Sequence, residues 1–133
     1  MLASGAQRLI HQYGVQPFRE VVVLTANSDG YQAALDFIAA RVRVQALADL
    51  RPHGEPSALA EQVKAAGVPV HTGNCLYEAI PKRGLRSIAG AILAPLDSEG
   101  RVQSAQRSLI ACDGIAMSVG WTCLLYTSDA ADE

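Results

Sequence analysis

The stretch TANSDG, residues 25–30, has the position of a phosphate-binding loop. It follows the apolar run VVVL and precedes YQAALDFIAA, which is typical of a helix. Aligning it on the G-x-G-x-x-G pattern of dinucleotide-binding folds puts Thr25, Asn27 and Gly30 at the three glycine positions. Only the third, which lets helix and strand pack closely, is a glycine. The loop predicts a strand, turn and helix in this order, and leaves open whether it holds a phosphate.

Two polar side chains in the loop bear on that question. Asn27 tolerates positive φ and could donate an amide proton to a phosphate, but its side chain occupies space that the ligand would use. Asp29 places a negative charge at the helix N-terminus, where it would repel the phosphate that the helix dipole attracts. We therefore favour a structural loop in which Asn27 and Asp29 cap the helix.

A second polar pair, Asp49 and Arg51, lies at the end of the next apolar run. Asp49 follows Gly30 by 19 residues, the spacing at which an acidic residue binds the ribose hydroxyls of NAD, and Arg51 could suit a 2′-phosphate. Strand-terminal Asp residues are also common at turns, and we favour that interpretation. Thr25, Asn27, Gly30, Asp49 and Arg51 thus form either a cofactor-binding set or the remnant of one.

The remaining residues with metal-binding or nucleophilic side chains show no site pattern. The histidines lack metal-ligand spacing, and the cysteines are odd in number and form no C-x-x-C pair. We expect surface or partly buried histidines and reduced, mostly buried thiols, with no catalytic residue and no metal site. These residues are His11, His53, His71, Cys75, Cys112 and Cys123.

Composition predicts one modest globular domain. The chain has 133 residues, of which 50% are hydrophobic, and a net charge of -2. Its longest basic segment is KRGLR, residues 82–86, which argues against nucleic acid or an anionic membrane as a partner. We expect a cytoplasmic protein, since no signal peptide or run of ~18 apolar residues is present.

The elements around the loop alternate between strand and helix. Ser4 could cap a first helix that Gly14 ends, and Ser57 could cap a later helix that Gly67 ends. The continuous β-branched run EVVVLT predicts a strand buried on both faces, as in a parallel sheet. We expect helices at 2–13, 30–40 and 58–66 and strands at 20–25, 42–50 and 68–72.

From residue 73 the pattern changes. Residues 85–97 and 101–113 predict an antiparallel hairpin joined by SEG, and 114–121 predict a final buried strand. The fold class is therefore α/β, a three-layer Rossmann-like nucleotide-binding subdomain with a parallel sheet and an antiparallel β-hairpin excursion. We expect it to span residues 1–121 of a longer chain. Residues 122–133, TCLLYTSDAADE, break the pattern and are expected to be a non-native tail.

The segments VVVLTANSDGY, AGVPVHTG, APLDSEGRV and ACDGIAMSVGW resemble one family. They are similar to the pyridine-nucleotide-disulfide-oxidoreductase-type region of the α subunit of heterotetrameric sarcosine oxidase, whose corresponding loop is also poor in glycine. The resemblance covers nearly all of residues 1–121. It implies a flavoenzyme complex that oxidatively demethylates sarcosine to glycine, with FAD, FMN, NAD and tetrahydrofolate distributed among its subunits.

The same resemblance implies a structural role for this segment. It would pack beside an NAD site formed by other residues of its chain, and contact other subunits of a hetero-oligomeric oxidase. No catalytic residue carries over, because the amine-oxidising site is expected on the β subunit. Two alternatives remain open: an NAD(P)H-binding module of a disulfide-oxidoreductase-type flavoprotein, and a non-catalytic module that offers the edge of the predicted hairpin to a partner subunit.

Overall fold

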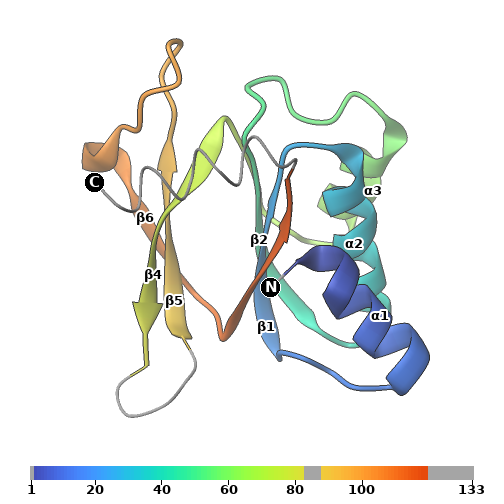
Figure 1. Ribbon diagram of the computed structural model, residues 1–133. Coiled ribbons are helices and arrows are strands. Elements are labelled where there is room, and N and C mark those ends of the chain that lie inside the picture. The colour runs from blue at the N-terminus through green and yellow to red at the C-terminus, as the bar shows by residue number, and fades with distance from the viewer. Residues whose placement is uncertain (1, 83–87, 120–133) are drawn as a thin grey trace.

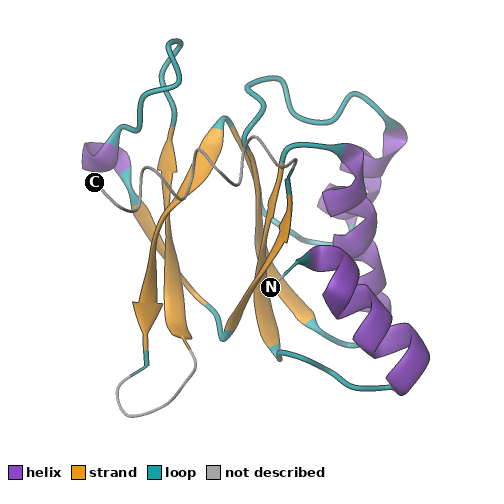
Figure 2. Ribbon diagram, viewed as in Figure 1, coloured by secondary structure: helices purple, strands orange, loops and turns teal. Residues whose placement is uncertain are grey.

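The computed structural model describes residues 2–82 and 88–119, which form three layers. Helices cover one face of a parallel sheet, and an antiparallel sheet lies on the other face (Figures 1 and 2). The predicted α/β class and three-layer architecture are confirmed. Residues 83–87, Trp121 and the expected non-native tail at 122–133 lie outside the described residues.

The parallel sheet has the strand order β3-β2-β1-β7. Its central strand, β1, pairs in parallel with β2 on one side and with β7 on the other. Both faces of β1 are covered, which explains its unbroken β-branched sequence. The strands are β1 (Glu20–Thr25), β2 (Arg43–Asp49), β3 (Val70–Thr72) and β7 (Gly114–Ser118).

Three helices pack on one face of this sheet: α1 (Ala3–Tyr13), α2 (Ser28–Ala39) and α3 (Ala58–Ala65). Gly14 ends α1 in the left-handed conformation, and Ser57 caps α3 by accepting a hydrogen bond from the Leu59 N–H, both as predicted. The predicted cap at Ser4 is wrong, because α1 begins one residue earlier and Ser4 lies inside it. Leu2 precedes the helix without a side-chain cap.

The antiparallel layer differs from the predicted hairpin, because it has three strands in the order β4-β5-β6. They are β4 (Asn74–Pro81), β5 (Ile88–Pro95) and β6 (Ser108–Ala111). The predicted turn does form, with Leu96 and Val102 bridged around it. The chain then makes a 3-10 helix, η1 (Ser104–Gln106), so the second predicted strand is much shorter than 101–113.

The strand β4 escaped prediction because its polar and apolar residues do not alternate cleanly. Its pairing with β5 shifts register twice, between Leu76 and Glu78 and between Ile80 and Pro81. A bulge changes which face the following side chains occupy, so period-two alternation is lost. All eight residues of β4 are exposed or half-buried, so the strand does not need the continuous apolar sequence of a buried one.

Small side chains fill the space between the two sheets. Ala46 and Ala48 of β2 face Ala91 and Leu93 of β5, with Cys112 buried beside them. Cys112 is thus a core residue, as predicted, and Cys75 on β4 is half-buried. Burial raises the pKa of both thiols, which keeps them protonated at neutral pH. None of the helices described here is long and apolar enough to cross a membrane.

Candidate functional site

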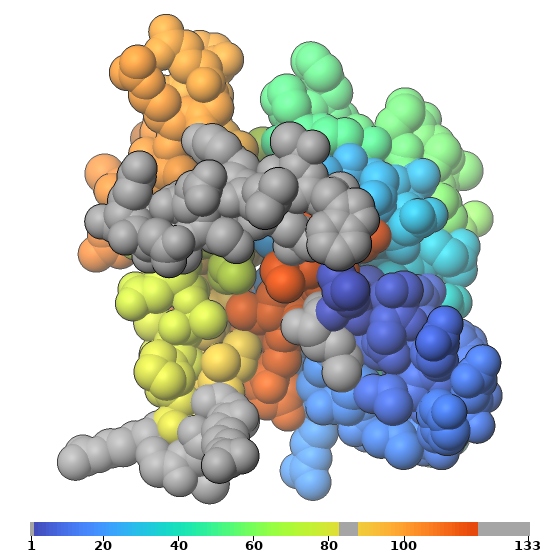
Figure 3. Space-filling model, viewed as in Figure 1, coloured from blue at the N-terminus to red at the C-terminus, as the bar shows by residue number. Residues whose placement is uncertain are grey.

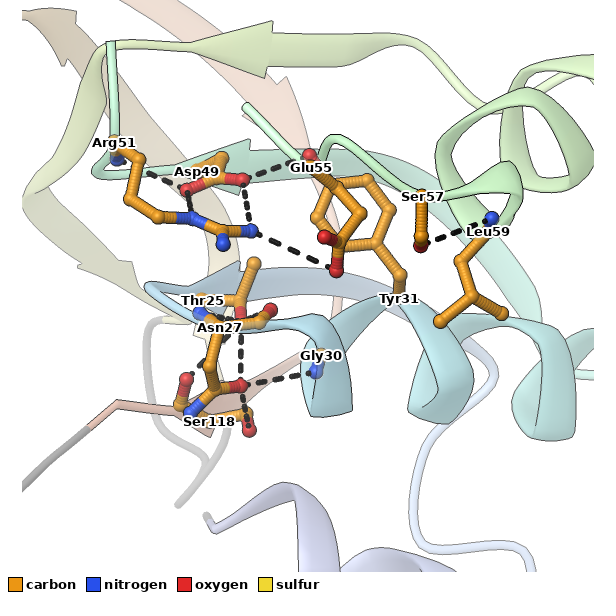
Figure 4. A network of polar contacts seen from close by, with 10 residues as sticks. All are labelled: Thr25, Asn27, Gly30, Tyr31, Asp49, Arg51, Glu55, Ser57, Leu59 and Ser118. Atoms are coloured by element: carbon orange, nitrogen blue, oxygen red, sulfur yellow. Dashed lines mark hydrogen bonds and ion pairs between the residues drawn. The ribbon is translucent and has the colours of Figure 1, made fainter. Parts of the chain in front are cut away.

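The candidate site lies where the carboxyl ends of β1, β2 and β7 meet the N-terminus of α2. In α/β sheets of this kind, ligands bind outside the carboxyl ends of the strands, where neighbouring connections diverge. Figure 4 shows two polar groups at this edge. One surrounds Asn27 and the other surrounds Asp49.

The Asn27 side chain occupies the N-terminus of α2. Its Oδ1 atom accepts hydrogen bonds from the Gly30 N–H at 3.3 Å and from Ser118 Oγ at 3.0 Å. The Thr25 hydroxyl lies 3.2 Å from the same oxygen. A phosphate oxygen at this helix end would need the N–H group that Asn27 already binds. The protein's own amide carbonyl therefore fills the place of the anion.

Asn27 is thus a helix cap, and Asp29 is not. Asn27 has extended backbone angles and directly precedes α2, whereas Asp29 lies within the first turn of the helix. Asp29 is exposed, so it adds a negative charge to this end of α2 without a capping contact. The helix N-terminus is consequently both filled and acidic.

Gly30 is required by the close approach of α2 to β1. A Cβ atom at position 30 would lie 2.2 Å from Thr25 Cβ and 2.2 Å from Thr25 Oγ1, far inside van der Waals contact. The third glycine of the motif therefore keeps its packing role. Thr25 stands where the motif has its first glycine, and its buried hydroxyl accepts a hydrogen bond from the Asn27 N–H at 3.1 Å.

The Asp49 carboxylate is fully buried and is bound by groups of the protein itself. It accepts hydrogen bonds from the Tyr31 hydroxyl at 2.8 Å and from the Arg51 backbone N–H at 2.9 Å. The Arg51 guanidinium binds both carboxylate oxygens, at 3.1 and 3.0 Å. Asp49 therefore closes a turn, and its oxygens do not face solvent.

Glu55 completes this second group. Its side chain is 5% exposed and lies 3.9 Å from Arg51 Nη2, the same nitrogen that binds Asp49. Its Oε2 atom makes no hydrogen bond with the described residues. One guanidinium thus compensates two buried carboxylates, which makes Arg51 the residue on which the charge balance of this edge depends.

Tyr31 should make the protein lose stability at alkaline pH. Burial and the hydrogen bond to Asp49 raise the pKa of Tyr31 well above the ordinary value of 10.0. Above pH ~10 an unfolded chain releases this proton while the folded chain keeps it, so the free energy of unfolding falls as pH rises, by up to ~1.4 kcal/mol per pH unit. Urea denaturation across this range should show a shallower decline for Tyr31→Phe. If stability fell equally with pH in the unmodified protein and in Tyr31→Phe, the raised pKa of Tyr31 would be contradicted.

A cavity of about 310 Å³ opens beside the loop, between the N-terminal ends of α1 and α2 and the end of β7. Its walls include Gln7, Asp29, Gln32 and Met117. In Figure 3, β7 is the orange-red surface between the antiparallel sheet and α1. The cavity has a carboxylate and no basic side chain among its lining residues, which disfavours a phosphate there.

The structure brings the predicted residues together in two separate sets. Thr25, Asn27 and Gly30 meet at the start of α2, and Asp49 pairs with Arg51. Whether any of them binds a cofactor stays a prediction. Among the described residues no group of histidine, cysteine or acidic side chains could hold a metal ion.

Sequence reasoning missed three participants: Tyr31, Glu55 and Ser118. Ser118 could have been found, because it ends a parallel strand and must meet the end of β1 at the same sheet edge. Tyr31 directly follows Gly30, but nothing local shows that its hydroxyl reaches a strand 18 residues further on. Glu55 lies in a polar loop that gives no signal of burial.

Comparison with solved structures shows the fold alone. Thioredoxin reductase from T. acidophilum matches with a TM-score of 0.62 and 16% identity, over 89% of this chain and 34% of its own. An FAD-dependent pyridine nucleotide-disulphide oxidoreductase from Desulfovibrio vulgaris matches with a TM-score of 0.61 and 14% identity, over 89% of this chain and 28% of its own. Thioredoxin reductase from Giardia duodenalis matches with a TM-score of 0.56 and 13% identity, over 76% of this chain and 30% of its own.

The chain thus has the fold of a region found in pyridine nucleotide-disulfide oxidoreductases, and spans about a third of the length of these proteins. No family model and no curated protein matches its sequence. At these identities the activity and ligands of the matched enzymes do not transfer with the fold.

Proposed function

We propose that this chain is a dinucleotide-binding-type subdomain of the α subunit of a sarcosine-oxidase-like flavoenzyme complex, in which it has a structural role beside an NAD site. The fold supports the general class, because it occurs in flavin-dependent pyridine nucleotide-disulphide oxidoreductases. The narrower assignment rests on the sequence segments that resemble the sarcosine oxidase α subunit. The parent complex would use FAD, FMN, NAD and tetrahydrofolate, and would act on sarcosine.

One observation carries the structural role: Asn27 Oδ1 holds the Gly30 N–H and the Ser118 hydroxyl at the helix end where a pyrophosphate would bind. The residues at this edge do not fit a dinucleotide as they stand. Asp49 is bound by Arg51 and Tyr31, so its oxygens are not available to ribose hydroxyls. The negative charge of Asp29 would repel a phosphate. The subdomain would keep the fold for packing against the remaining domains and subunits of the oxidase.

A second candidate function, an NAD(P)H-binding module, is favoured by the position of Arg51. Its side chain is 32% exposed at the carboxyl edge of the sheet, where a nicotinamide dinucleotide carries its adenosine ribose. To bind NADPH, Arg51 would have to break its ion pair with Asp49 and bind the 2′-phosphate. To bind NADH, Asp49 would have to give up Arg51 and accept hydrogen bonds from the ribose hydroxyls. Either exchange must overcome a bidentate, partly buried ion pair.

Calorimetric titration of the full chain with NADH and with NADPH separates the two functions. We expect no saturable binding of either nucleotide up to millimolar concentration, because the anion position is filled and the ribose carboxylate is engaged. Saturable binding in the micromolar range would overturn the structural role and establish the module.

The variant Asn27→Gly serves as the matched comparison. It restores the second glycine of the motif and removes the carbonyl that holds the Gly30 N–H. Nucleotide binding by this variant, and not by the unmodified chain, would identify the Asn27 side chain as the obstacle. Circular dichroism must first show that the variant remains folded, because the substitution removes the acceptor of the Gly30 N–H and of the Ser118 hydroxyl.

A further inference from the structure

The four edge strands of the two sheets are protected to different degrees. Free edges offer unpaired backbone groups to other chains, and proteins usually blunt them with bulges, proline, charge or a covering element. Strand β4 has two register shifts, ends at Pro81 and contains Glu78. Strand β3 has only three residues, and the outer side of β7 carries a bridge from Leu2.

Strand β6 is also short, but the described part of the chain shows none of the other devices on it. Its four residues, Ser-Leu-Ile-Ala, include no proline and no charge, and its pairing with β5 has no register shift. It ends the antiparallel sheet on the side of the molecule away from the helices (Figure 1). Leu109 on this strand is 66% exposed, the second most exposed of the large hydrophobic residues that the structure describes. An uncharged edge of this kind is suited to pairing with another strand.

The residues flanking β6 carry opposite charges. Arg107 directly precedes the strand, and Asp113 follows it at the bend toward β7. Antiparallel pairing of β6 with the same strand of a second copy, with Ile110 opposite Ile110, brings Arg107 of each copy toward Asp113 of the other. Opposite charges across an antiparallel pair stabilise it, and the arrangement has the two-fold symmetry of an isologous dimer.

The same register matches the apolar residues. Ile110 packs toward the space between the sheets, so the odd-numbered neighbours Leu109 and Ala111 face outward by strand alternation. Each Leu109 would lie opposite Ala111 of the second copy and lose part of its exposure to water. Arg107 now lies 5.9 Å from the ring centre of Tyr77 and is exposed, so it can turn toward the new partner. Asp113 accepts bonds from the Arg19 and Glu20 N–H groups and is also exposed.

We propose that β6 is a self-association edge, through which two copies of this chain form a weak, continuous antiparallel sheet across a two-fold axis. Pairing through β6 depends only on this edge and its flanking charges, and is independent of whether the loop at Asn27 binds a nucleotide.

Sedimentation velocity of the full chain over a range of concentrations tests the proposal. The unmodified chain should show a monomer–dimer equilibrium that weakens at high salt, because part of the attraction is between exposed charges. Leu109→Lys should abolish the dimer by placing a charge on the edge, and Arg107→Glu should abolish it by setting like charges opposite each other. Arg107→Lys should retain it.

Tyr13→Lys is the matched control, because Tyr13 is 68% exposed on α1, away from the edge. It should dimerise as the unmodified chain does. A chain that stays monomeric at every concentration would overturn the proposal. A dimer that persists in Leu109→Lys would also overturn it, because that dimer must use another surface. A dimer that persists in Arg107→Glu would show that the two strands do not pair in this register. Thermal melts of each variant show that the monomer remains folded.

Discussion

Gly30→Ala should destabilise the protein by ~3 kcal/mol, the largest effect expected for a methyl group added at any glycine that the structure describes. The added Cβ would stand 2.2 Å from two atoms of the Thr25 side chain. Thr25 is fully buried and belongs to the central strand, so it cannot turn aside without losing its hydrogen bonds to Asn27 and Ser118. The midpoint of urea denaturation measures the loss.

Two further variants assign this loss to the contact. Gly5→Ala adds the same methyl group in α1, where nothing lies within 4 Å, and should raise stability by ~0.5–1 kcal/mol. Thr25→Gly removes the opposing side chain. In a double-mutant cycle it should recover ~1–3 kcal/mol of the penalty from Gly30→Ala. Strict additivity of the two substitutions would show that α2 does not approach β1 this closely.

Asp49→Ala should cost ~3 kcal/mol, because it removes a buried carboxylate that accepts hydrogen bonds from four donor atoms of Tyr31 and Arg51. The Tyr31 hydroxyl would lose its acceptor in a dry environment. Arg51 would keep only the weaker contact with Glu55 at 3.9 Å. Chemical denaturation at neutral pH measures the difference, and Asp49→Asn should cost less, since it keeps the shape and one acceptor oxygen.

Glu99→Ala is the matched control for the charged pair. Glu99 Oε2 lies 3.2 Å from Arg101 Nη2, but the two side chains are 67% and 79% exposed. Water already solvates each partner, so the loss should stay below ~1 kcal/mol. If Asp49→Ala cost no more than Glu99→Ala, the buried network would contribute little net stability and the turn at Arg51 would depend on its backbone alone.

The parallel layer could be predicted because its signals are local. A strand covered on both faces is apolar throughout, as in β1, and the helix that follows shows one apolar face. Ser57 and Gly14 marked helix ends because capping depends on the residue itself. The antiparallel layer was predicted less well. Bulges in β4 and the 3-10 helix before β6 depend on contacts with β5 that have no counterpart in local sequence.

The candidate site shows the same contrast between local signals, which could be predicted, and tertiary contacts, which could not. The motif alignment placed Thr25, Asn27 and Gly30 together, and the geometry of the cap follows from the preference of Asn for the position before a helix. Only two of the four residues around Asp49 could be predicted from the sequence. Asp49 and Arg51 are two residues apart, but Tyr31 and Glu55 join them only after β2 has paired beside β1 and the loop has folded back. Burial of a charged residue depends on such tertiary contacts.

The central place of β1 has a consequence for how the chain folds. One neighbour, β2, follows it after a single helix, but the other, β7, follows only after the whole antiparallel layer, with Val21 paired to Gly114. Pairing strands so distant in sequence closes a long loop and slows the search for the native state. During synthesis one edge of β1 stays unpaired until residue 118 has emerged, which leaves this apolar strand open to misassociation in the nascent chain.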